Sequence, residues 1–117
     1  MKCSELVASL EKAEKEYRST GFVDAACLEH TAREGALGSI RLAKSGPLAD
    51  KLGESYEETR NLNPRQRAAF YIRKHMQWIK DFRKDTWEQA ARATKLMDTY
   101  QGILDIVESM TDAEWSQ

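Results

Sequence analysis

The chain has 117 residues, of which 41% are hydrophobic and 32% are charged, and its formal net charge is −1. This length suits one core, so we expect residues 1–117 to form a single domain. A net charge so close to zero excludes a choice of partner by bulk electrostatics, so any preference must come from how the charges are arranged.

Neither the charged N-terminal stretch nor any later run is apolar enough for a signal peptide or a membrane span. We therefore expect a cytoplasmic protein with no membrane partner. Two cysteines, Cys3 and Cys27, are too few for a disulfide framework and are expected to be reduced thiols.

The sequence pattern is helical throughout. Residues that favour strands nowhere alternate over the length of a strand, and only two prolines and six glycines interrupt the chain. We predict an all-α fold, a compact bundle of four to five helices. The two C-terminal helices are expected to be the longest, and one continuous helix over residues 64–110 is the alternative.

The first half of the chain predicts three helical segments. The first is expected over residues 4–20, where a serine suits the N-cap. Residues 22–46 are rich in alanine and glycine, which predicts either one buried helix or two short helices broken near Gly35 and Gly38. Pro47 suits the first turn of a third helix.

Asn63 as N-cap and Pro64 as first helical residue predict the start of the next helix. Its apolar arc is wide enough for a central position in the bundle. The arc includes His75 and Trp78, which we therefore expect to lie in the core.

The C-terminal part predicts one further long helix, over residues 86–110. Thr111 followed by Glu114 is the pattern of a capping box. It predicts a last short turn that ends at Trp115.

Charge is distributed unevenly along the chain. Residues 1–59 carry 8 Lys or Arg and 11 Asp or Glu, residues 60–95 carry 10 and 3, and residues 96–117 carry none and 5. A turn of about 100° per residue places most bases of the middle segment on one side of a helix. The candidate binding residues on that side are Arg65, Phe70, Arg73, Lys80, Arg83 and Lys84.

This basic face predicts a non-enzymatic subunit or accessory protein that binds nucleic acid or a nucleoprotein complex. Arginine and lysine would neutralise backbone phosphates, and Phe70, which lies within the polar arc, would offer a ring for a base. The structural alternative is a solvated face whose bases pair with the acidic ends of the chain, with Phe70 packed beneath a neighbouring helix.

Two other functions fit the sequence. One is an inhibitor or adaptor, of the kind found in phages and mobile elements, whose basic face docks on an acidic protein surface. The other is an obligate helical homo-oligomer in which Phe70, Trp87 and Trp115 are buried between chains.

Catalytic and metal-binding patterns are weak. Cys27, His30 and Glu34 are spaced so that they share one side of a helix, but no fourth ligand accompanies them. No glycine-rich phosphate loop is present in the sequence. We therefore predict that the protein is not an enzyme and holds no metal or cofactor.

Overall fold

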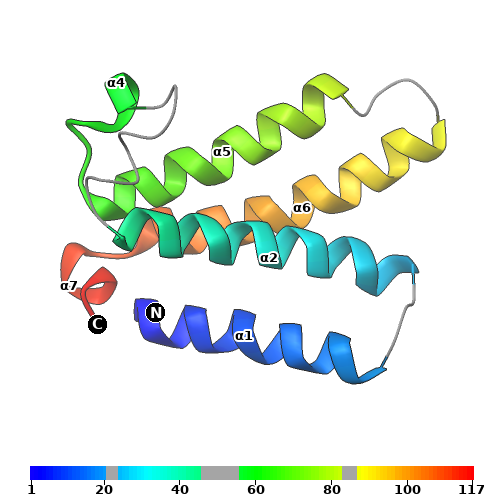
Figure 1. The fold of residues 1–117 in the computed structure, drawn as a ribbon, viewed down its shortest axis with the longest axis horizontal. Coiled ribbons are helices and arrows are strands. Elements are labelled where there is room, and N and C mark those ends of the chain that lie inside the picture. The colour runs from blue at the N-terminus through cyan, green and yellow to red at the C-terminus, as the bar shows by residue number, and fades with distance from the viewer. Residues whose placement is uncertain (21–23, 46–55, 83–86) are drawn as a thin grey trace.

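The computed structural model describes residues 1–20, 24–45, 56–82 and 87–117, and these ranges contain helices and no strand. Their long helices are α1 (Cys3–Thr20), α2 (Asp24–Lys44), α5 (Pro64–Phe82) and α6 (Trp87–Ser109). Two single turns, α4 (Tyr56–Thr59) and α7 (Asp112–Trp115), accompany them. The predicted all-α bundle is confirmed (Figure 1).

The described helix lengths bear on part of the prediction. Helix α6 is the longest described helix with 23 residues, but α2 has 21 and exceeds α5, which has 19. The residues that follow Phe82 lie outside the described residues, so the expectation that the two C-terminal helices are the longest stays a prediction for α5. The third helix predicted from Pro47 falls mostly on residues 46–55, which lie outside the described residues.

Helix α2 is the central element of the bundle. It packs against α1 on one side and against α5 and α6 on the other (Figure 1). The helix is unbroken through its glycines, so the alternative of two short helices is wrong. Its core positions carry small or aliphatic side chains, which let neighbouring helices approach closely; they are Ala32, Ala36, Leu37, Ile40 and Ala43. The central position predicted for residues 64–84 therefore belongs to α2.

Gly35 shows how close this approach is. A Cβ atom at this position would overlap the hydroxyl oxygen of Tyr100 on α6 and would lie 3.1 Å from the Cζ atom of that ring. A Cβ at Gly38, less than one turn further along α2, would meet nothing within 4 Å. Close packing of α2 and α6 thus requires a glycine at residue 35, whereas residue 38 has room for a side chain.

Helices α5 and α6 run antiparallel and pack on each other (Figure 1). Two helices that lie side by side cannot be parts of one continuous rod, so the alternative of a single helix over residues 64–110 is wrong. Ile72 on α5 and Leu96, Leu104 and Val107 on α6 are all buried in the core. This pairing creates a seam between the two helices.

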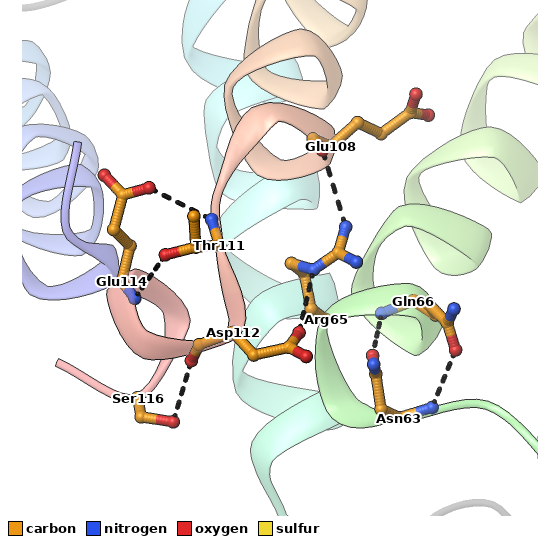
Figure 2. Close-up of polar contacts among 8 residues, drawn as sticks. All are labelled: Asn63, Arg65, Gln66, Glu108, Thr111, Asp112, Glu114 and Ser116. Carbon is orange, nitrogen blue, oxygen red and sulfur yellow. Dashed lines mark hydrogen bonds and ion pairs between the residues drawn. The ribbon is translucent and has the colours of Figure 1, made fainter.

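The predicted helix starts at Asn63 and Thr111 are both confirmed (Figure 2). The backbone N–H of Gln66 donates to Oδ1 of Asn63 at 2.8 Å, and the backbone N–H of Asn63 donates to Oε1 of Gln66 at 3.0 Å. Thr111 and Glu114 exchange the same pair of hydrogen bonds, at 3.1 and 3.0 Å. Such reciprocal bonds satisfy N–H groups that have no partner within the helix.

Arg67 joins the start of α5 to the end of α2. Its guanidinium donates to the carbonyl oxygen of Ala43 at 2.9 Å and to that of Leu62 at 3.2 Å. The carbonyl groups of the last helical turn have no partner within the helix and carry partial negative charge, so a cation is favourable there. Arg67 therefore has a structural role at the C-terminal end of α2.

Helix α7 places Trp115 in the core, with 6% of its surface exposed. The ammonium group of Lys44 lies 4.8 Å from the centre of the Trp115 ring, a cation–π arrangement. Trp115 is thus buried within its own chain and not between chains. Within the described ranges, no helix combines the length and the apolar character needed to cross a bilayer.

Candidate binding faces of helix α5

Helix α5 brings three of the predicted site residues together at its N-terminal half. Arg65, Phe70 and Arg73 line an open cavity of about 330 Å³ between α5 and α6. The ring of Phe70 is half-buried and packs against the core, edge-on to Tyr71 with the ring centres 5.9 Å apart. Packing within the chain thus buries part of the Phe70 ring, in line with the structural alternative.

Carboxylates from the C-terminal end of α6 and from α7 contact this half of the face. Arg65 lies between Glu108 and Asp112, donating to the Glu108 carbonyl oxygen and to the Asp112 carboxylate, each at 3.5 Å (Figure 2). Arg73 forms an ion pair with the Glu108 carboxylate. The Arg73 side chain remains 55% exposed, whereas that of Arg65 is 21% exposed. Arg73 is therefore the more accessible of the two guanidinium groups.

A second cavity, of about 280 Å³, continues along the two helices from Arg73 to Lys80. Its lining comprises two cations, two amides and three apolar side chains, namely Arg73, Lys80, Gln77, Gln101, Met76, Met97 and Leu104. Gln77 and Gln101 each donate to an aspartate one turn further along their helix, at 2.9 and 2.8 Å. We call the two cavities together the α5–α6 seam.

The remaining two predicted site residues, Arg83 and Lys84, lie outside the described residues. Of the six predicted positions, the structure thus places four: Arg65, Phe70, Arg73 and Lys80. All four line the seam. Glu108 and Asp112 belong to the acidic C-terminal end of the chain, with which the structural alternative pairs the bases, and the tertiary fold decides that they contact Arg65 and Arg73.

On the opposite side of α5, two side chains that were predicted to be buried are exposed. Trp78 is 53% exposed and His75 is exposed, although both were expected in the core. They face the part of α2 that carries Gly35 and Gly38, which have no side chains with which to cover them. Here two adjoining cavities lie between α2 and α5, of about 300 and 470 Å³, and Gly35, His75 and Trp78 line both.

The smaller of these cavities, which we call the Glu34 pocket, lies at the junction of α2, α5 and α6. Its lining residues are Thr31, Glu34, Gly35, His75, Trp78, Ile79, Leu96 and Tyr100. The rings of His75 and Tyr100 are stacked, with centres 5.5 Å apart and planes 10° from parallel. Partial desolvation in this stack lowers the pKa of the His75 imidazole, and burial raises the pKa of the Tyr100 phenol.

We expect the His75 stack to make the free energy of unfolding depend on pH. The unfolded imidazole is protonated near its ordinary pKa of about 6.5, whereas the folded imidazole takes up a proton only at lower pH. Protonation therefore favours the unfolded chain, and stability should fall as the pH drops below about 6.5. The variant His75→Phe keeps a ring on Tyr100 but cannot be protonated, so this part of the pH dependence should disappear.

Chemical denaturation of the wild type and of His75→Phe, between about pH 5 and pH 8, measures the effect. Carboxylates titrate in both proteins, so the difference between the two curves isolates His75. A difference that does not change with pH would contradict the expectation.

Among the described residues, no group of three or more His, Cys, Asp or Glu side chains comes together as a metal site would require. Nε2 of His30 lies 3.5 Å from the carboxylate of Glu34, and the side chain of Cys27 is outside the described residues. Cys3 is a buried free thiol.

The functional assignment has to rest on the chain's own residues and on the two faces of α5. Comparisons with models of protein families, with curated proteins and with solved structures find no match.

Proposed function

We propose that this protein is a non-enzymatic accessory protein that binds nucleic acid along the α5–α6 seam. The observation that carries the proposal is the cavity between Arg73 and Lys80. Two cations and two amide side chains from two helices converge there, and none of the described residues that line the cavity has a carboxylate. Such a set of donors suits the phosphate oxygens of a nucleic acid backbone.

Each group of the seam has a distinct role in this proposal. The planar guanidinium of Arg73 can bind a phosphate in a bidentate manner, and Lys80 adds a point charge. Gln77 and Gln101 each donate one amide N–H to an aspartate and have a second N–H and a carbonyl group for phosphates or base edges. Met76 and Met97 provide an apolar wall that can adapt to a base or a sugar.

The Glu108 carboxylate competes with an incoming phosphate for Arg73. An exposed ion pair contributes up to about 1 kcal/mol, so a phosphate can displace the carboxylate at modest cost. Removal of that carboxylate charge by Glu108→Gln should therefore tighten binding by up to about fivefold. Lys80→Glu should weaken binding and lower the dependence on salt by about one counterion.

Fluorescence anisotropy with labelled single-stranded RNA and DNA of about 20 nucleotides tests the proposal, at about 50 and about 200 mM salt. Lys12→Glu is the matched control, because Lys12 is exposed on α1 and the substitution makes the same charge change far from the seam. We expect Lys80→Glu to lose affinity and Lys12→Glu to keep it. Equal affinities of the two variants, or no binding at the lower salt concentration, would exclude the seam.

A second candidate is an adaptor or inhibitor whose seam binds an acidic protein segment. Glu108 and Asp112 favour it, because they show that protein carboxylates fit against Arg65 and Arg73. A polyglutamate peptide of the same charge as the oligonucleotide, titrated in the same assay, separates the two functions. Binding of the peptide without binding of RNA or DNA would replace the first proposal with the second.

A further inference from the structure

The Glu34 pocket is chemically different from the α5–α6 seam and lies on the other side of α5. Its floor is apolar, formed by Ile79 and Leu96, and aromatic side chains of Trp78, His75 and Tyr100 border it. Among the described residues that line the pocket, Glu34 is the one with a carboxylate and none is a lysine or arginine. The pocket thus combines aromatic walls with a single negative charge.

The electrostatics of these groups favour a positive ligand. The face of an aromatic ring carries partial negative charge and attracts cations, most strongly in tryptophan. Partial desolvation lowers the pKa of His75, so the imidazole is neutral near pH 7 and does not repel a cation. The side chain of Glu34 is 60% exposed and lies 3.5 Å from Nε2 of His30, so its carboxylate remains accessible from solution.

The size and position of the pocket restrict what can enter. A volume of about 300 Å³ is at the lower end of the range for ligand sites. Its wall on the α2 side is set by the close contact of Gly35 with Tyr100, whose hydroxyl occupies the space that a side chain at residue 35 would fill. The adjoining cavity beyond Trp78 is lined by Lys74, whose charge disfavours a cation there. A small positive group is therefore directed to the Glu34 side of the indole.

We propose that the Glu34 pocket binds an organic cation, an alkylammonium or guanidinium group held between the Trp78 indole and the Glu34 carboxylate. The group can belong to a small molecule or to a lysine or arginine side chain of a peptide. The proposal does not depend on the binding of nucleic acid at the seam.

Isothermal titration calorimetry with tetramethylammonium, with agmatine and with a short arginine-containing peptide tests this site, at constant ionic strength. We expect saturable binding to the wild type and its loss in Glu34→Gln. Trp78→Ala should weaken binding by about 2- to 30-fold, the range of a cation–π contact, and Trp78→Phe should weaken it less. Binding of the peptide alone would identify a protein side chain as the ligand.

Glu108→Gln is the matched control, since it removes the same charge on α6 outside the pocket and should leave cation binding unchanged. Glu34 and Trp78 are both exposed, and thermal unfolding by circular dichroism verifies that each variant is folded. Equal binding by Glu34→Gln and Glu108→Gln, or no saturable binding to the wild type, would overturn the proposal. Lys80→Glu should not alter cation binding, so failure at the seam and failure at the pocket are distinguishable.

Discussion

Replacement of Gly35 by alanine should lower the free energy of unfolding by about 1–3 kcal/mol, the usual cost of an overpacked core. A Cβ atom at residue 35 overlaps the hydroxyl group of Tyr100 and lies within 3.3 Å of two ring carbons. Tyr100 is 3% exposed and stacked on His75, so the ring has little room to move away. Urea denaturation measures the change.

Gly38→Ala is the control for this prediction, because it is the same substitution in the same helix with nothing within 4 Å of the new atom. It should raise the free energy of unfolding by up to about 1 kcal/mol, since alanine favours the helix more than glycine does. In a Gly35→Ala background, Tyr100→Phe removes the overlapping oxygen and should recover part of the loss. Equal effects of the two glycine substitutions would contradict the packing described.

Replacement of Trp115 by alanine should cost about 3–5 kcal/mol, a large part of the 5–15 kcal/mol that stabilises a typical domain. The indole is buried, and it fixes the single turn of α7, which is too short to be stable alone. The substitution also removes the cation–π contact of Lys44. If α7 moves, the ammonium group of Lys44 loses its hydrogen bond to the backbone carbonyl oxygen of residue 115, which is 3.4 Å long in the wild type. Urea denaturation again provides the measurement.

Trp78→Ala removes the same side chain from an exposed position and should cost about 1 kcal/mol or less. Sedimentation of both variants tests the homo-oligomer predicted from the sequence. Burial of Trp115 between chains would make Trp115→Ala dissociate an oligomer, whereas burial within the chain predicts lower stability without a change of mass. Similar losses of stability for Trp78→Ala and Trp115→Ala would be inconsistent with the structure.

The features that the sequence predicted correctly are local ones. The caps at Asn63 and Thr111 depend on side chains that bond to backbone groups three residues away, so the pattern of residue types is sufficient. The all-α class follows in the same way from helical periodicity. The central position of α2 was only one of two alternatives, because alanine and glycine suit a buried helix with close neighbours and equally suit a break between two short helices.

The candidate sites show why tertiary contacts limit such predictions. Arg65, Arg73 and Lys80 share one side of α5 as the periodicity indicates, but their acidic neighbours come from the far end of the chain. Trp78 and His75 lie at the border of the apolar arc, where coverage depends on the residues of the opposite helix. The positions of Gly35 and Gly38 can be read from the sequence, but their location opposite His75 and Trp78 depends on how α2 packs against α5.

The bond from Arg67 to Ala43 has a consequence for chain entropy. It ties the end of α2 to the first turn of α5 and so closes a span of 24 residues along the chain. The entropy of closing a flexible loop grows only with the logarithm of its length, and doubling the length costs about 0.6 kcal/mol. Substitution of Arg67 therefore removes contacts that offset this closure entropy.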